Sequence, residues 1–143
     1  MNIKSLIQTS ALALCLSCTL GATAQTTPLT KEKVVFQVSD NEPARWNTTL
    51  NNAKNVQDLL GADKVDIEIV AYGPGIHMLK DESMAANRVT EATQAGIQIV
   101  ACENTMTVLK LSRADMNKSV GYVKAGVVEL MKRQREGWAY IRP

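Results

Sequence analysis

The sequence has no large excess of charge, few aromatic residues and no glycine-rich phosphate loop. Its 143 residues carry a formal net charge of +2, and aromatic residues make up 4%. A field of this size does not draw a protein to nucleic acid or to an acidic membrane surface. The glycines of "AYGPGIHMLK" (residues 71–80) match neither the GxGxxG spacing nor the Walker lysine motif. We interpret the basic cluster at 132–135 as a solvated helix end. We therefore expect no nucleic-acid partner and no cofactor.

A long apolar run occurs only near the start of the chain. Lys4 precedes an apolar segment at 6–20, and Ala22-Thr23-Ala24 closes it with small residues. The run is shorter than the roughly 20 residues that a membrane-spanning helix needs. We predict a signal peptide at 1–24 that is cleaved after Ala24, a flexible start at 25–32 and one α/β domain at 33–143. A lipoprotein cysteine at Cys15 is disfavoured because Leu14 is not small. The expected location is the periplasm, without membrane insertion.

Cysteine is nearly absent from the predicted mature chain. Cys15 and Cys18 lie inside the leader, so Cys102 alone remains and cannot close a disulfide within the chain. With His77 as the sole histidine, the chain cannot build a zinc site of the usual kind, and we expect no metal. Cys102 is therefore either a small buried side chain or a working thiol. The sequence leaves both interpretations open.

The rest of the chain alternates between strand and helix patterns. β-Branched apolar runs and short alternating segments predict strands at 34–38, 65–72, 97–101, 120–123 and 138–141. Apolar residues at helical spacing predict helices that end near Gly61, at 83–95, at 103–111 and at 125–136. The first should bury a face running from Trp46 to Leu60, and the last should turn Val127, Leu130 and Met131 inward. This order predicts a three-layer α/β/α sandwich with a five-stranded, mainly parallel sheet.

Ligands of parallel α/β sheets gather outside the carboxyl ends of the strands. The segments expected at that edge are 39–40, 72–77, 102–105 and 124–126. Cys102 stands where a strand passes into a helix, and free N–H groups there favour a thiolate, although Glu103 opposes it. His77 could act as a base for this thiol, or it could be an incidental loop residue. The terminal segment 138–141 could pack as an edge strand or take part in a subunit interface.

Several segments together resemble the DsrE/DsrF-like family, in particular its exported members. They are "KVVFQVSD", "AYGPGIHML", "GIQIVACENTM" and "GVVELMKRQREGWAYIRP", in that order along 33–143. The resemblance implies a parallel sheet of order 4-3-2-1-5 and homo-oligomers, commonly trimers or hexamers. Three crossovers would then cover one face of the sheet, and the helix at 125–136 alone would cover the other. The second face would be thinly covered, which favours subunit association.

The resemblance also suggests a function for the cysteine. In sulfur-relay members of the family, a cysteine after the third strand accepts sulfur as a persulfide, and Cys102 matches that position. Those members are cytoplasmic, and the residues that follow their cysteine differ from Glu103-Asn104-Thr105-Met106. The first hypothesis is a periplasmic sulfur carrier, sulfurtransferase-like if it is an enzyme, that works with a sulfur donor or acceptor protein. Under this hypothesis Cys102 accepts the sulfur, and the backbone amides of Asn104 and Thr105 stabilise the sulfur anion. His77 would act as the base for the thiol.

The alternative hypothesis is a non-catalytic oligomeric binding module of the same fold. Cys102 would then only pack, and the sheet edge would receive a ligand. The binding residues expected at this edge are Tyr72, Gly73, Gly75 and Lys124.

Overall fold

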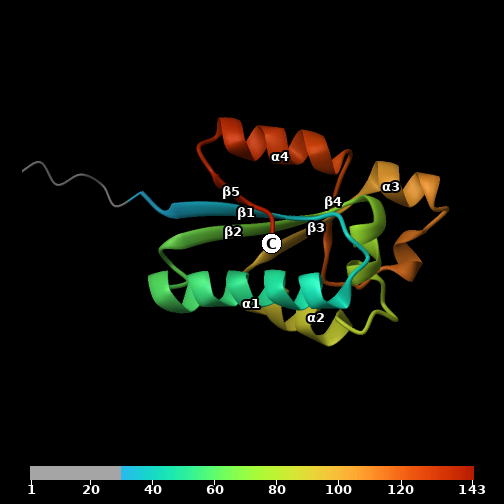
Figure 1. Ribbon diagram of the computed structural model, residues 1–143, viewed down its shortest axis with the longest axis horizontal. Coiled ribbons are helices and arrows are strands. Elements are labelled where there is room, and N and C mark those ends of the chain that lie inside the picture. Colours follow the sequence, from blue (N-terminus) through green and yellow to red (C-terminus); the bar gives the residue numbers. More distant parts are fainter. Residues whose placement is uncertain (1–29) are drawn as a thin grey trace, which may run out of the picture.

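The computed structural model describes residues 30–143, which form one α/β domain around a five-stranded parallel sheet (Figure 1). The strand order is β4-β3-β2-β1-β5, and every neighbouring pair is parallel. The strands are β1 (Glu32–Val38), β2 (Val65–Ala71), β3 (Gln98–Cys102), β4 (Gly121–Val123) and β5 (Ala139–Ile141). The predicted fold class and strand order are confirmed. The predicted signal peptide and most of the predicted start at 25–32 lie outside the described residues, and Glu32 already begins β1.

Helices cover the two faces of the sheet unequally. Figure 1 shows α1 and α2 against one face and α4 against the other, while α3 lies at the end of the sheet beside β3 and β4. The α-helices are α1 (Pro43–Leu60), α2 (Ala86–Gln94), α3 (Glu103–Val108) and α4 (Gly126–Arg135), and the 3₁₀ helices are η1 (Gly73–Leu79) and η2 (Arg113–Asp115). Helix α3 is shorter than the predicted 103–111, because the chain turns at Lys110, whose φ is 55°.

The hydrophobic core divides in the same unequal way. The α1/α2 side holds a large buried cluster that includes Phe36, Ile69 and Ile99 from three adjacent strands. The α4 side holds a small cluster of Val35, Val70, Leu130 and Trp138. Successive strand residues point to opposite faces, so neighbours such as Val35 and Phe36 belong to different clusters. One face of the sheet is therefore thinly covered.

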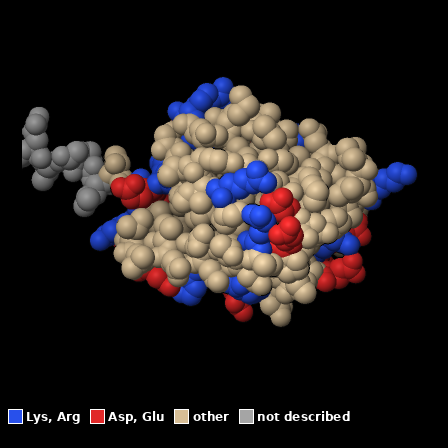
Figure 2. All heavy atoms as spheres, in the orientation of Figure 1, with Lys and Arg blue, Asp and Glu red and all other residues tan. Residues whose placement is uncertain are grey.

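The outer surface of α4 is apolar, which corrects part of the sequence interpretation. Val127 and Met131 were expected to face inward, but they are 52% and 53% exposed, and Val128 is 58% exposed. Leu130 faces the sheet as predicted, and helix α4 packs through it and Gly126. Figure 2 shows that the surface over α4 is largely uncharged apart from basic side chains toward one end. On α1, Leu60 was expected on the buried face and is 44% exposed.

The segment after β2 is helical, although the sequence predicted no helix between the strand at 65–72 and the helix at 83–95. Gly73, Pro74 and Gly75 begin the 3₁₀ helix η1, which buries Ile76, Met78 and Leu79. A side chain at position 75 would overlap the backbone of Val38, so only glycine lets η1 pack against the end of β1. The role of Gly75 is therefore to bring η1 close to the carboxyl edge of the sheet.

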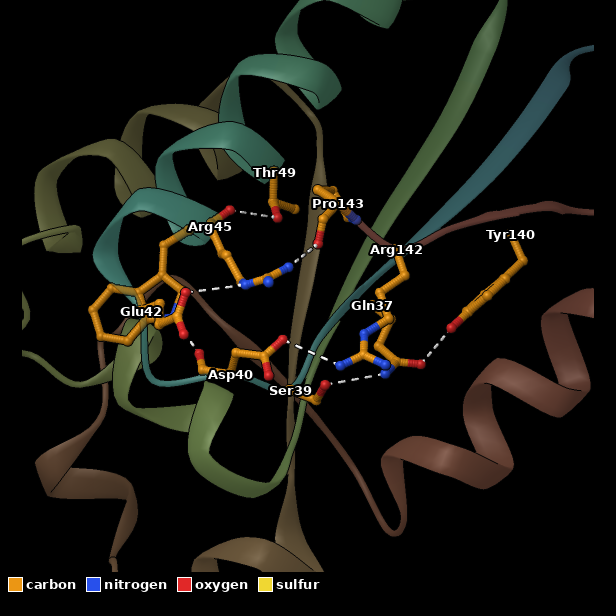
Figure 3. A network of polar contacts seen from close by, with 10 residues as sticks. Gln37, Ser39, Asp40, Glu42, Arg45, Thr49, Tyr140, Arg142 and Pro143 are labelled. Atoms are coloured by element: carbon orange, nitrogen blue, oxygen red, sulfur yellow. Dashed lines mark hydrogen bonds and ion pairs between the residues drawn. The ribbon is translucent and has the colours of Figure 1, made fainter.

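The C-terminal strand β5 pairs with β1 in the sheet, and side-chain contacts also hold the chain beside β1 (Figure 3). The Tyr140 hydroxyl donates to Gln37 Oε1 at 2.6 Å, and Arg142 pairs with Asp40 at 3.3 Å. Arg45 of α1 also donates to the carbonyl oxygen of Pro143 at 3.2 Å. The chain end therefore packs as an edge strand, one of the two interpretations of 138–141.

Within residues 30–143, no helix combines the length and the apolar character that crossing a membrane requires.

Candidate functional site

Cys102 ends β3 and caps the first turn of α3. It lies opposite Val123 of β4 and is 5% exposed. Val100, two residues earlier on β3, packs in the small cluster, so Cys102 points toward the α4 side of the sheet. Cys102 itself belongs to neither hydrophobic cluster of the described residues. The thiol is thus buried at the carboxyl end of a strand, although it lies in neither of the two clusters.

Groups at the starts of two helices lower the pKa of the thiol. Burial acts to raise the pKa of the Cys102 thiol, but hydrogen bonds from the Thr105 hydroxyl and from the N–H groups of Gly126, Thr105 and Asn104 outweigh it, so the pKa lies below the ordinary cysteine value. The first N–H groups of a helix have no partner within the helix, which leaves those of α3 and α4 available. The N–H of Asn104 is shared with the carbonyl of Lys124, at 3.1 Å. The local chemistry favours a thiolate.

Glycine at position 126 is required by the packing of Tyr72. A Cβ at position 126 would lie 2.9 Å from the Cβ of Tyr72, closer than side-chain atoms approach. The contact places the start of α4 over the end of β2, and its first N–H over Cys102. Tyr72, predicted as a binding residue, therefore packs against the start of α4.

The carboxylate next to the thiol is neutralised by two cations. Lys124 Nζ and an Arg113 guanidinium nitrogen each lie 2.9 Å from Glu103 oxygens. Hydrogen bonds from Lys124 and Arg113 lower the pKa of Glu103, so this carboxyl stays ionised but paired. The Arg113 guanidinium also lies 4.2 Å from the centre of the Tyr122 ring. The opposition that Glu103 was expected to offer to a Cys102 thiolate is reduced by this pairing. Lys124, predicted to bind a ligand, makes its described contact with Glu103.

A pocket of about 440 Å³ lies beside the thiol site and unites four of the predicted residues. Gly73, His77, Asn104 and Thr105 line it, whereas Cys102, Tyr72, Gly75 and Lys124 do not. Thr105 belongs both to the pocket lining and to the surroundings of the thiol. The sheet edge thus holds two adjoining places, a thiol under two helix starts and a pocket between η1 and α3.

The described residues show no contact that supports the predicted pairing of His77 with Cys102. His77 is half-buried on η1 and lines the pocket. Among residues 30–143, no hydrogen bond or ion pair joins His77 to Cys102. The groups that lower the thiol pKa come from α3 and α4. The structure therefore gives His77 a place in the pocket wall.

A buried ion pair under α4 was missed by sequence reasoning. Glu68 on β2 is 1% exposed and pairs with Arg133 of α4. Arg133 also contacts Glu129 at 3.0 Å and lies 4.6 Å from the centre of the Trp138 ring. Arg133 was interpreted as part of a solvated basic helix end, and the structure corrects this. The pair ties α4 to the middle of the sheet and so helps to hold Gly126 in place.

No group of three or more His, Cys, Asp or Glu side chains among residues 30–143 is arranged to hold a metal ion.

Comparison with known proteins places these observations in context. Residues 32–143 match the model of the DsrE/DsrF-like family. A protein of unknown function from Methanobacterium thermoautotrophicum, MTH1491, has a similar structure with a TM-score of 0.76 and 34% sequence identity, covering 79% of this chain and 100% of its own. A second one from Bacteroides thetaiotaomicron, BT1422, shares the fold at a TM-score of 0.65 and 14% identity, covering 78% of this chain and 95% of its own. A search of curated proteins found no match.

Proposed function

The chain belongs to the DsrE/DsrF-like family, and on this premise we propose that it is a periplasmic sulfur carrier that holds sulfane sulfur as a persulfide on Cys102. The proposal is carried by the position of Cys102 between the end of β3 and the start of α3, where Thr105 and the starts of α3 and α4 lower the pKa of its thiol. A thiolate is the nucleophilic form of cysteine, and a lowered pKa favours it.

The proposed loading step balances without an added oxidant or reductant. The Cys102 thiolate attacks the outer sulfur of a persulfide donor R–S–S–H. A new S–S bond forms at Cys102 as the S–S bond of the donor breaks, and the electron pair of that bond leaves with R–S⁻. Cys102 then carries the –S–S–H group, which a second thiolate takes by the same exchange.

The hydrogen bonds assign roles to the neighbouring residues. Thr105 and Gly126 donate to the anionic sulfur before transfer and to the inner sulfur afterwards. Lys124 and Arg113 keep the charge of Glu103 from opposing the thiolate. Because an S–S bond is about 2.05 Å long, loading moves the reactive atom from the buried position of Cys102 toward solvent. The carrier thus protects the thiol when empty and presents its sulfur when loaded.

Location and partners form part of the same proposal. A leader at 1–24 would deliver the chain to the periplasm, where one cysteine cannot be lost to an internal disulfide. The exposed apolar surface of α4, formed by Val127, Val128 and Met131, supports a homo-oligomer, a trimer or a hexamer. A sulfur donor or acceptor protein would meet the carboxyl edge of the sheet.

Mass spectrometry of the intact chain tests the proposal. After incubation with polysulfide, the native chain should gain the mass of one sulfur atom, and reduction should remove it. The chain tested begins at Gln25, after the expected leader, so Cys102 is its single thiol, and Cys102→Ser is the control that should lack this adduct. An equal adduct in Cys102→Ser, or none in the native chain, rejects sulfur transfer at Cys102.

A second function is favoured by the low exposure of the cysteine. At 5% exposed, Cys102 also suits a structural role, and the pocket of about 440 Å³ would then serve a non-catalytic oligomeric binding module. Prompt reaction of native Cys102 with a thiol reagent separates the two, because a purely packing cysteine stays inert until the chain unfolds.

A further inference from the structure

The pocket beside the thiol is lined by few polar side chains. Its lining includes no Lys, Arg, Asp or Glu, and its polar side chains are Asn41, His77, Asn104 and Thr105. Pro74, Val108 and Leu109 supply apolar surface, and Val108 is 79% exposed. A volume of about 440 Å³ falls in the range of small-molecule sites, which lies at about 300–1,000 Å³. The wall suits a small organic group better than an inorganic anion.

Thr105 connects this pocket to the sulfur chemistry. Its hydroxyl oxygen accepts a hydrogen bond from the Gly73 N–H at 2.9 Å, on the η1 side of the pocket. The same hydroxyl also helps to lower the pKa of the Cys102 thiol. A molecule in the pocket therefore lies one side chain away from the thiol. Asn104, next to Thr105 on α3, adds an amide that can hydrogen-bond to the sulfur end of such a molecule.

We propose that the pocket between η1 and α3 binds the uncharged organic group of a low-molecular-weight persulfide, which is the sulfur donor to Cys102. The inference rests on the proposed carrier function and names its substrate class. The apolar group R packs against Val108, Leu109 and Pro74, and the –S–S–H end lies at Thr105. Attack by the Cys102 thiolate on the outer sulfur leaves Cys102–S–S–H and releases R–S⁻ from the pocket.

The pocket discriminates against inorganic donors. Thiosulfate carries two negative charges, and an anion needs cations or several N–H donors to replace its water. The lining offers no cationic Lys or Arg, and the nearby Lys124 and Arg113 are engaged with Glu103. An organic persulfide instead loses apolar surface to the wall, which is favourable by roughly 25 cal/mol per Å².

Binding is measured first on the full chain with Cys102→Ser, in which no persulfide can form at position 102. The probe is benzyl methyl sulfide, a thioether that cannot exchange with thiols, and the readout is the NMR amide shifts of Asn104 and Thr105. Val108→Lys places a cation in the pocket at the end of α3, where it suits the helix dipole. Leu59→Lys is the matched control, because Leu59 is 85% exposed in the last turn of α1 and outside this pocket.

We expect saturable shifts at Asn104 and Thr105, an affinity about tenfold weaker in Val108→Lys, and no change in Leu59→Lys. Thiosulfate should not displace the probe. Absence of saturable shifts, equal weakening in both lysine variants, or displacement by thiosulfate at the same concentration each overturns the assignment of the pocket. Because this experiment does not need Cys102, failure of the carrier function leaves its result unaffected.

Donor use is measured next on the native chain by the rate of sulfur loading on Cys102. Val108→Lys should lower kcat/KM about tenfold for benzyl persulfide and leave the rate with inorganic polysulfide unchanged. An equal loss with both donors, or with neither, contradicts the pocket as the donor site. If no donor loads Cys102, the carrier function is wrong, and an organic persulfide is then not a sulfur donor to this chain.

Discussion

The hydroxyl oxygen of Thr105 accepts a hydrogen bond from the backbone N–H of Gly73 at 2.9 Å. This contact joins the start of η1 to the first turn of α3. Because the oxygen acts here as an acceptor, the hydroxyl can still donate its hydrogen, and it helps to lower the pKa of Cys102. One threonine therefore holds the two loops of the sheet edge together and stabilises the thiolate.

Replacing Thr105 tests that double role. Thr105→Val keeps the shape of the side chain but removes the donor, so the pKa of Cys102 should rise by about one unit, as expected for loss of a hydrogen bond to a charged group. Thr105→Ser keeps the hydroxyl and should retain the native value. Thiolate ultraviolet absorbance against pH, corrected with the Cys102→Ser chain, gives the measurement. Equal pKa values for the Val and Ser variants would show that the hydroxyl does not act on the thiol.

His77→Gln should leave the reactivity of Cys102 unchanged. His77 lines the pocket and has no hydrogen bond to Cys102 among the described residues, and the thiol pKa is lowered by donors from α3 and α4. Alkylation rates of Cys102 across pH should therefore superimpose for native and variant chains. A loss of about tenfold in the alkylation rate of His77→Gln would instead restore the Cys–His pair that the sequence suggested.

The buried pair of Glu68 and Arg133 should be costly to break. Burial raises the pKa of Glu68, and the hydrogen bond and charge of Arg133 oppose that rise. Arg133→Met leaves the carboxylate buried without a cation and should lower the free energy of unfolding by about 3 kcal/mol near neutral pH. The double variant Glu68→Gln with Arg133→Met removes both charges and should recover most of that loss.

The pH dependence of this variant has a definite sign. Without Arg133 the folded-state pKa of Glu68 rises further, so the folded chain holds a proton that the unfolded chain releases above about pH 4.3. The loss in free energy of unfolding of Arg133→Met relative to the native chain is then small at acidic pH. It grows as the pH rises through the folded-state pKa of Glu68. Urea unfolding at several pH values measures it. If the loss in free energy of unfolding stays constant with pH, its cause is lost packing of Arg133 against Trp138 and not the unpaired charge of Glu68.

The exposed face of α4 should hold the proposed oligomer together. Val128→Glu and Met131→Glu place a carboxylate on that face, where contact between copies would bury it without a partner. Either change should shift the sedimentation coefficient to that of a smaller species. Leu59→Glu on the exposed end of α1 is the control and should sediment as the native chain does. A native chain that sediments as a monomer contradicts the expected trimer or hexamer.

The fold could be predicted from sequence because its strands carry strong local signals. Runs such as 34–38 are β-branched and apolar, and Gly61 ends α1 with a φ of 97°. The placement of Cys102 at the end of β3 and the start of α3 followed from the same pattern. The strand order rested on the family resemblance, since local signals do not say which strands become neighbours.

Features set by tertiary contacts could not be predicted in the same way. Glu68 lies in an alternating stretch that indicates exposure, and it is buried because Arg133, far away in sequence, covers it. Val127 and Met131 were assigned to the inner face of α4 because an apolar residue looks alike in a core and in an exposed apolar surface. The effect of the Gly126 N–H on Cys102 depends on how α4 crosses the sheet. The spacing of apolar residues in the sequence does not define that crossing.

The pH titration of Cys102 in the folded chain tests the central claim most directly. The rate of alkylation by iodoacetamide, followed by mass spectrometry of the peptide that contains Cys102, reports the thiolate fraction and its access to solvent together. The account predicts prompt reaction with a midpoint clearly below the free-cysteine value of about 8.5. A thiol that reacts only after unfolding, or one whose midpoint lies at or above that value, would contradict it.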